Sequence, residues 1–156
     1  MSAPAGRLII ICGLPGAGKT TLARQLETTL GAVRYAPDEW LQAINLDQYD
    51  ETRRSAIESL QWQAAQAILR LGGIAIIEWG TWARSERDML RLGARALGAK
   101  VELRYLDAPT DVLLDRIHKR GYENPPITRE LLDGWERSVQ PPTEAEFALY
   151  DPPIVP

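Results

Sequence analysis

The sequence predicts an α/β domain in which a small parallel sheet is covered by helices on both faces. Short apolar runs rich in β-branched residues alternate along the chain with segments of helical period, which is typical of parallel strands joined by helical crossovers. A glycine-rich stretch also separates the first apolar run from the first helical segment. Because the chain of 156 residues is about one domain long, a single domain is expected over residues 1–156.

Four segments are expected to form the strands. The first is Leu8–Cys12, an unbroken apolar run that precedes the glycine-rich stretch. The others span residues 32–35, 74–77 and 101–106, and each begins soon after a glycine that ends a helical segment. Because helical segments lie between consecutive strands, the connections suit a parallel sheet.

Helices are expected in the segments between these strands. The apolar face of the first helix is formed by Leu22, Leu26 and Leu30. This helix ends at Gly31, a short helix begins near Asp38, and a longer one begins at Asp50. The residues of the longer helix expected to face the core are Ile57, Leu60, Ala64, Ile68 and Leu71. Further helices are expected to begin near Ser85, Pro109 and Thr128.

Composition excludes several classes of protein. A content of 45% hydrophobic and 25% charged residues is that of a folded globular domain rather than a disordered chain. The formal net charge of -3 argues against a general electrostatic grip on duplex nucleic acid or anionic lipid. The longest strictly apolar run has five residues, too few for a membrane span, and Cys12 is the single cysteine. We therefore expect no membrane partner, no disulfide, no secretion signal and a cytoplasmic location.

The segment Gly13–Thr20 carries the clearest chemical signal. It matches the phosphate-loop (P-loop, Walker A) pattern of a glycine, four residues and then Gly-Lys-Ser/Thr. The loop lies between a buried strand and a helix, so its backbone N–H groups and the helix N-terminus can converge on phosphate oxygens. Lys19 is expected to reach the β and γ phosphates, and the Thr20 hydroxyl is expected to bind Mg²⁺.

This loop narrows the fold class to a P-loop NTPase-type three-layer sandwich with a small parallel sheet and a helical lid. The loop residues expected to hold the nucleotide are Gly13, Leu14, Pro15, Gly16, Ala17, Gly18, Lys19, Thr20 and Thr21. The alternative is an ordinary glycine-rich turn before a surface helix. Since a phosphate loop alone does not separate kinases, GTPases and motor ATPases, other residues must distinguish them.

Two acidic residues follow predicted strands, at the edge of the sheet where ligands bind in this class of fold. Glu78 comes directly after residues 74–77, where it can bind Mg²⁺ or a metal-bound water, orient a substrate hydroxyl, or end a strand at the surface. Asp38 follows residues 32–35, and its carboxylate can accept the proton of a hydroxyl that attacks the γ phosphate. The alternative for Asp38 is a helix N-cap.

Arg116 and Arg120 lie four residues apart on a segment of helical pattern, so their guanidinium groups share one face. Two such groups can clamp one phosphate and stabilise the charge of a phosphoryl group in transfer. The proline-containing segment that follows would let this part move as a lid, expected at about residues 114–127. The alternative is a solvated basic face shared with His118 and Lys119.

Aromatic and basic residues surround the expected acceptor crevice. Of the five tryptophans, three are close to it in sequence: Trp40, Trp79 and Trp82. They can form a flat apolar wall for a ring-shaped substrate, or they can pack in the core. Arg84 or Arg87 is expected either to contact a phosphate or anionic substrate or to remain on the surface.

The phosphate loop, Asp38 after a short strand, Glu78 and the run Leu114–Gly121 followed by two prolines together resemble the small P-loop kinases. This group includes polynucleotide 5′-hydroxyl kinase, chloramphenicol phosphotransferase, gluconate kinase and the zeta toxins. The resemblance covers about residues 7–140 and implies a P-loop α/β sandwich. It also implies that Asp38 is the general base toward the acceptor hydroxyl, and that the two lid arginines bind the donor phosphates.

Two positions differ from the polynucleotide kinase pattern. Trp40-Leu41 stands where that kinase has an arginine for the 3′ phosphate of its substrate, and Glu78 replaces the customary aspartate. Together with the negative net charge, these differences favour a small molecule over nucleic acid as the acceptor.

The sequence therefore predicts a kinase that transfers the γ phosphate of ATP, with Mg²⁺, to a hydroxyl of a small molecule. The expected catalytic residues are Lys19, Asp38, Arg116 and Arg120, and the expected metal ligands are Thr20 and Glu78. The alternatives are a polynucleotide 5′-hydroxyl kinase and a nucleotide-binding switch with slow hydrolysis. The Asn-Lys-x-Asp motif of guanine switches is absent from the sequence. The acceptor, the choice between ATP and GTP, and the oligomeric state are left open.

Overall fold

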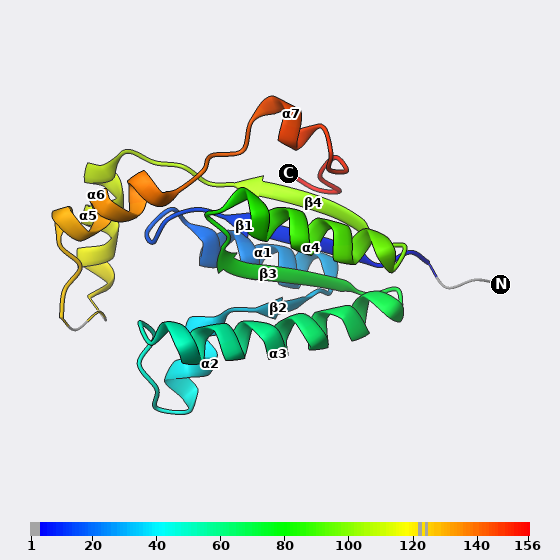
Figure 1. The fold of residues 1–156 in the computed structure, drawn as a ribbon, viewed down its shortest axis with the longest axis horizontal. Helices are drawn as coiled ribbons and strands as arrows, with labels where there is room; N and C mark the ends of the chain where they lie inside the picture. Colours follow the sequence, from blue (N-terminus) through cyan, green and yellow to red (C-terminus); the bar gives the residue numbers. More distant parts are fainter. Residues whose placement is uncertain (1–3, 122, 124) are drawn as a thin grey trace.

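Parallel strands form the centre of the molecule (Figure 1). The computed structural model describes residues 4–121, 123 and 125–156. The strands are β1 (Arg7–Cys12), β2 (Val33–Tyr35), β3 (Ile74–Gly80) and β4 (Lys100–Tyr105). These four strands pair in the order β2-β3-β1-β4, and every pairing is parallel. The predicted α/β class and its small parallel sheet are confirmed.

Helices connect the strands and cover the sheet. In the described residues they are α1 (Lys19–Leu30), α2 (Pro37–Ala43), α3 (Glu51–Arg70), α4 (Arg84–Ala96), α5 (Thr110–Arg120), α6 (Arg129–Ser138) and α7 (Glu144–Phe147). Within the same residues, no helix combines the length and apolar character that crossing a bilayer requires.

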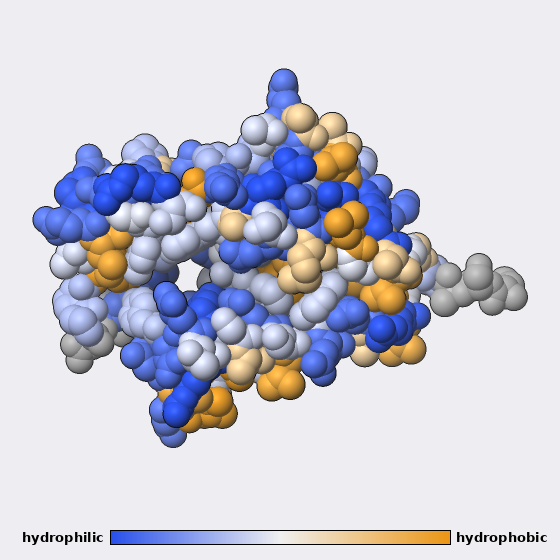
Figure 2. All heavy atoms as spheres, in the orientation of Figure 1, coloured by the Kyte–Doolittle hydropathy of each residue, from blue (hydrophilic) through white to orange (hydrophobic). Residues whose placement is uncertain are grey.

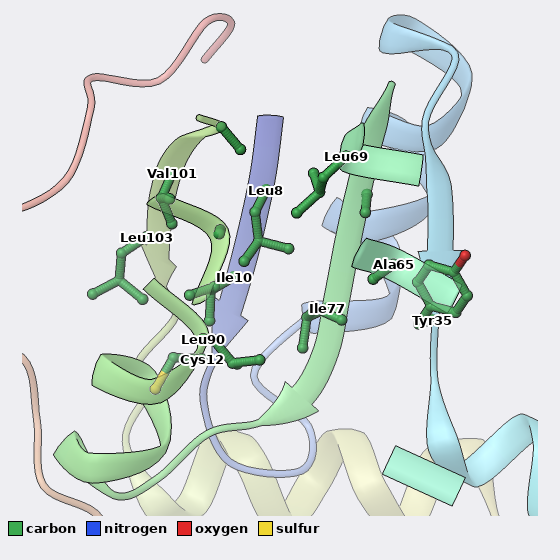
Figure 3. Close-up of a cluster of buried hydrophobic side chains, with 13 residues drawn as sticks. Leu8, Ile10, Cys12, Tyr35, Ala65, Leu69, Ile77, Leu90, Val101 and Leu103 are labelled. Atoms are coloured by element: carbon green, nitrogen blue, oxygen red, sulfur yellow. The ribbon is translucent and has the colours of Figure 1, made fainter. Parts of the chain in front are cut away.

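The sheet is buried on both faces, as its continuous apolar strands predict. One face packs against α3 and α4 (Figure 3), through a cluster that includes Leu8, Ile10, Ala65, Leu69, Ile77 and Leu90. The other face packs against α1, through a cluster that includes Ile9, Ile11, Ala23, Leu26 and Ile76. Successive residues of β1 thus enter opposite layers, and the arrangement is the three-layer sandwich that the sequence predicts.

Helices α5 and α6 pack on each other beside the sheet rather than over it (Figure 1). Their shared core consists of Leu14, Leu113, Ile117, Ile127 and Leu132. Because Leu14 belongs to the glycine-rich loop, this loop is in direct contact with the helical pair. The predicted lid, residues 114–127, corresponds to most of α5 and the connection to α6, and residues 122 and 124 of it lie outside the described residues.

The predicted helix starts at Asp50 and Thr128 are confirmed by their caps, and the start near Ser85 is confirmed to within one residue although the cap differs. Asp50 caps α3 by accepting from the N–H of Arg53 at 3.1 Å, and Thr128 caps α6 in the same way through Leu131 at 3.2 Å. Ser85 does not cap α4, which begins at Arg84. The N–H of Arg84 instead donates to the side-chain oxygen of Gln140 at 2.7 Å, and this partner is distant in sequence.

The core-facing side of α3 also differs from the prediction. Leu60 and Leu71 are exposed, and the buried residues are Gln61, Ala65 and Leu69. Gln61 is fully buried, and its Oε1 accepts a hydrogen bond from Trp79 Nε1 at 2.9 Å. Ala64 and Ile68 of the predicted stripe do pack against the core cluster, so the prediction is wrong only at Leu60 and Leu71 and missed the polar contact of Gln61.

Candidate active site

A pocket of about 840 Å³ opens at the carboxyl ends of the strands. It lies between the glycine-rich loop, the first turns of α2 and α3, the end of β3, and the α5–α6 pair, and the surface is visibly hollowed there (Figure 2). Its volume is that of a small-molecule site, which is roughly 300–1,000 Å³. Apart from Gly13 and Ala17, all residues expected to bind nucleotide or metal or to act in catalysis line it.

The glycine-rich loop connects β1 to α1 and depends on glycine at two positions. Gly16 and Gly18 have φ values of 82° and 98°, which L-residues rarely adopt. A Cβ on Gly16 would also lie 2.8 Å from the carbonyl oxygen of Leu113, so the loop packs tightly on α5. Gly18 precedes α1, whose first N–H groups have no acceptor within the helix and form a binding site for an anion.

Lys19 lies at the start of α1, and its amine bonds back to the loop. Its Nζ donates to the carbonyl oxygen of Gly13 at 2.7 Å, and the indole of Trp82 donates to the same oxygen at 3.3 Å. Burial lowers the pKa of the Lys19 amine from 10.5 to about 8, although the carboxylates of Glu78 and Asp38 raise it. A phosphate group beside this amine would favour its charged form.

Thr20 and Glu78 lie side by side. The Thr20 hydroxyl donates to Oε1 of Glu78, and Arg34 Nη1 donates to Oε2 of the same carboxylate at 2.7 Å. Strand β3 continues to Gly80, which pairs with Cys12, so Glu78 lies within the strand rather than just after it. The Glu78 side chain is only 5% exposed, so a carboxylate that merely ends a strand at the surface is excluded.

The donor set at this point fits a magnesium ion. A hydroxyl and a carboxylate are hard oxygen ligands, and Mg²⁺ commonly takes few protein ligands and completes its shell with water and substrate phosphates. In the described part of the chain, no group of three or more His, Cys, Asp or Glu side chains could hold a metal by itself. A cation at Thr20 and Glu78 would therefore depend on phosphate oxygens for part of its coordination.

Asp38 faces the pocket from the first turn of α2. The N-cap of this helix is Ala36, so the alternative of a capping role for Asp38 is wrong. The Asp38 carboxylate is paired with Arg54 of α3, and 54% of the Asp38 side chain is exposed. Arg54 also donates to the carbonyl oxygen of Trp79 in β3 and to Glu58 of its own helix, both at 3.1 Å, so it joins Asp38 to β3 as well as to α3.

The lid arginines reach the pocket from α5. Arg116 Nη1 donates to the carbonyl oxygen of Gly16 at 3.1 Å, so it lies directly above the loop. Arg120 lines the same pocket and donates from Nε to Glu123 at 2.9 Å. The ring of His118 lies 2.9 Å from the carbonyl oxygen of Ile127, which ties it to the lid itself.

Three residues that the sequence associated with the crevice have other roles. Arg87 is fully buried and binds Glu146 through two hydrogen bonds of 2.7 and 2.8 Å, so it does not contact a ligand. Arg84 pairs with Asp88 in the same helix. Trp40 packs edge-on against Tyr35 rather than lining the pocket, whereas Trp79 and Trp82 do line it.

Sequence reasoning missed several residues that shape the site, above all Arg34 and Arg54. Arg34 had a usable signal, because a charged residue in a short strand flanked by apolar residues needs a partner. Arg54 had none, since its contacts join α3 to α2 and β3 across distant parts of the sequence. Tyr49 and Trp135 were missed for the same reason, and their rings stack at 6.4 Å beside the pocket.

The strand–loop–helix unit, the acid in the adjacent strand and the α5–α6 pair that packs on the loop define this protein as a P-loop NTPase with the fold of the small P-loop kinases. The chain belongs to the AAA domain family AAA_33, whose sequence model matches residues 8–142. The resemblance expected from the sequence is thereby confirmed.

A curated relative is the uncharacterized protein Rv2004c of Mycobacterium tuberculosis, which is 32% identical over 139 residues. This match covers 80% of the present chain and 28% of the relative, so the chain spans little more than a quarter of that protein.

Solved structures show the same fold. A chain of the Pnkp1/Rnl/Hen1 RNA repair complex matches with a TM-score of 0.72 at 21% identity, over 88% of this chain and 45% of that chain. A gluconokinase from Sinorhizobium meliloti matches with a TM-score of 0.61 at 18% identity, over 94% of this chain and 81% of that chain.

Proposed function

We propose that the protein is a kinase that transfers the γ phosphate of ATP, in complex with Mg²⁺, to a hydroxyl group of a small molecule. The observation that carries this proposal is that one pocket holds both the phosphate loop with Lys19 and a separate carboxylate, Asp38, fixed by Arg54. A nucleotide-dependent switch needs the loop but has no use for a positioned base on the opposite wall.

The donor side would hold the triphosphate. Loop residues Gly13–Thr21 and the N-terminus of α1 offer backbone N–H groups to its oxygens. Lys19 and Arg116 now donate to carbonyl oxygens of the loop itself, so both groups already lie where the phosphates would bind. With Arg120 on the same wall, three cationic side chains would neutralise charge on the phosphoryl group in transfer.

Magnesium would be held by Thr20 and Glu78. When bound, the ion would neutralise charge on the β and γ phosphates. Arg34 fixes the Glu78 carboxylate from the other side, and Glu39 in turn binds Arg34 Nη2 at 2.6 Å and Arg24 at 3.0 Å. This chain of ion pairs connects the proposed metal ligand to α2, the helix that carries Asp38.

Asp38 would act as the general base. Its carboxylate accepts the proton of the acceptor hydroxyl while that oxygen forms a bond to the γ phosphorus and the bond from this phosphorus to the bridging oxygen of ADP breaks. Arg54 orients the carboxylate through their ion pair. The acceptor would therefore lie between Asp38 and the loop.

Aromatic side chains beside the lid would help exclude water. Trp135 of α6 lies with its ring centroid 6.0 Å from that of Trp82 and 6.4 Å from that of Tyr49. These contacts join α6 to the segment after β3 and to the α2–α3 connection. A lid held closed in this way would favour transfer to the acceptor over hydrolysis.

A polynucleotide 5′-hydroxyl kinase is the second candidate, favoured by the likeness to the RNA repair complex. The pocket wall that carries Asp38 argues against it, because the one guanidinium of this wall, Arg54, is already paired with Asp38 and Glu58.

We place the reaction in the cytoplasm, in keeping with the single, buried Cys12.

Transfer of labelled phosphate from ATP tests these functions directly. The acceptors would be sugars, nucleosides, amino alcohols and a 5′-hydroxyl oligonucleotide, with and without Mg²⁺. We expect Mg²⁺-dependent labelling of a small molecule, whereas labelling of the oligonucleotide alone would support the second candidate. Binding of ATP without acceptor-dependent turnover on any of them would instead support a switch.

A further inference from the structure

The wall of the pocket opposite the phosphate loop carries an excess of negative charge. We call it the acceptor wall and define it by Asp38, Glu51, Arg54, Glu58, Trp79, Trp82 and Glu86, all of which line the pocket. It presents four carboxylates and one guanidinium. An anionic acceptor would have to approach these carboxylates without a compensating cation.

Each nitrogen of the one guanidinium of this wall already donates to an oxygen of the protein. Arg54 donates from Nη1 to Asp38, from Nη2 to the carbonyl oxygen of Trp79 and from Nε to Glu58. Recognition of a phosphate or carboxylate on the acceptor generally relies on a guanidinium fork. Here that fork is occupied by the protein's own oxygens.

Two of the carboxylates, by contrast, lack a cationic partner. Glu51 and Glu86 form no ion pair with any residue that the structure describes. Burial raises the pKa of Glu58, and the carboxylates of Glu86 and Asp38 raise it further, while Arg54 opposes them. A positive group placed among these side chains would relieve the repulsion between them.

Aromatic rings border the same space. Trp79 and Trp82 belong to the acceptor wall, and the rings of Trp82 and Trp135 lie 6.0 Å apart. The faces of indole rings are electron-rich, so they attract cations as well as apolar groups. Carboxylates and indoles together form a site suited to a cation with an apolar body.

We propose that the acceptor is an alcohol that carries a protonated amine, with the amine directed at the unpaired carboxylates Glu51 and Glu86 and the rest of the molecule against Trp79 and Trp82. This inference rests on the proposed kinase function and names its substrate class. The hydroxyl would then lie near Asp38, on the path to the phosphate loop.

Two sets of compounds matched in shape and differing in charge test this substrate class. One set is phenylalaninol, 3-phenylpropane-1,2-diol and 3-phenyllactate, and the other is glucosamine, glucose and glucuronate. Binding to the full chain with Mg-ADP would be measured by calorimetry, and ADP release from ATP would be measured separately. We expect the cationic member of at least one set to bind about tenfold more tightly than its anionic counterpart.

Variants of the unpaired carboxylates separate charge recognition from folding. Both Glu51 and Glu86 are exposed, so the double variant Glu51→Gln/Glu86→Gln should fold normally. It should weaken binding of the cationic compound about two- to fivefold, the effect of losing exposed ion pairs, and leave the neutral compound unaffected. The matched control is Glu144→Gln, at an exposed position of α7 outside the pocket. It should leave binding of both the cationic and the neutral compound unchanged.

The possible outcomes distinguish the substrate class from the kinase function. Tighter binding of the anionic members, or a preference for cations that the double variant leaves intact, would overturn the amine-bearing acceptor. If no alcohol stimulates ADP release but the cationic members still bind best, the kinase function fails while the charge preference stands. If only the anionic compounds stimulated ADP release from ATP, the proposed substrate class would be overturned and the kinase function would be supported.

Discussion

Glu78 and Glu102 are the same residue type in two strands of one sheet, and they lie toward its opposite ends. Each is buried and bound by arginine: Glu78 by Arg34, and Glu102 by Arg7 and Arg104. Glu78 lines the pocket and accepts from a hydroxyl of α1, whereas Glu102 is fully buried and also accepts from the N–H of Ile154 at 3.3 Å.

This difference shows that burial and an ion pair do not identify a functional acid. At the amino end of the sheet, the C-terminal segment closes over the network, and the carbonyl oxygen of Val155 accepts from Arg104 at 2.5 Å. At the carboxyl end, the corresponding space is a pocket. A buried carboxylate that keeps access to a ligand can act in chemistry, and one that is sealed by the chain can only act on stability.

The largest effect is expected from Lys19→Ala at the carboxyl end. Removing the amine takes away a cation that would stabilise the phosphoryl group in transfer, so kcat/KM should fall by about 10³-fold or more. Steady-state phosphate transfer from ATP measures this. Lys100→Ala, an exposed lysine at the amino end of β4, is the matched control and should keep parental activity. Equal activity of the Lys19 variant and the parent would refute the assigned role.

Asp38→Asn should separate chemistry from nucleotide binding. Without a base for the acceptor hydroxyl, kcat is expected to fall by at least about 10²-fold. The Kd for Mg-ATP should stay nearly constant, because Asp38 lies on the wall opposite the loop. Turnover kinetics and calorimetry on the same preparation give both values. If both were impaired equally, Asp38 would be a structural residue that holds Arg54.

Glu102→Gln should affect stability but not chemistry. The substitution leaves Arg7 and Arg104, both mostly buried, without their carboxylate, and we expect the free energy of unfolding to fall by about 3 kcal/mol. Urea denaturation measures this loss, and activity per folded molecule should not change. Glu78→Gln should instead impair the chemistry, because it removes a proposed Mg²⁺ ligand, and its phosphate transfer should respond less to added Mg²⁺ than that of the parent. If Glu102→Gln impaired transfer in the folded protein, the two ends of the sheet would not be functionally separate.

The smallest effect is a pH dependence of nucleotide affinity. Because the pKa of Lys19 is lowered to about 8 and phosphate favours the charged amine, binding should take up a proton above that pH. Affinity should be highest below pH 8 and fall as the pH rises through it, by at most about tenfold per pH unit. Calorimetry in two buffers of different ionisation enthalpy detects the proton. The Lys19→Arg variant stays charged, so its nucleotide affinity should not change with pH over this range. A nucleotide affinity of the parent that does not change with pH would argue against a lowered pKa of Lys19.

The phosphate loop was predictable because its residues are contiguous. Pattern, strand and helix lie within residues 7–30, so local sequence determines both the conformation and the chemistry. The helix caps at Asp50 and Thr128 were predictable for the same reason. Asp38 and Glu78 were recognised from their positions after strands, since the topology of a parallel sheet gathers such residues at one edge.

The contacts around these acids were not predictable. Arg54 reaches Asp38 from the next helix, and Arg34 reaches Glu78 from the next strand, so both depend on packing that no local pattern encodes. Arg87 was misjudged because a buried arginine is rare, and its partner Glu146 lies in a short helix far along the chain. The acceptor wall combines residues from three helices, a strand and the loop that follows this strand, which explains why the sequence left the acceptor open.

Calorimetric titration with Mg-ATP tests most directly whether the carboxyl end of the sheet is a nucleotide site. We expect saturable heat at submillimolar nucleotide for the parent and for Glu102→Gln, and a strong loss of affinity for Lys19→Ala. No heat from the parent at millimolar Mg-ATP or Mg-GTP would contradict a triphosphate site at this loop, and with it the proposed kinase function.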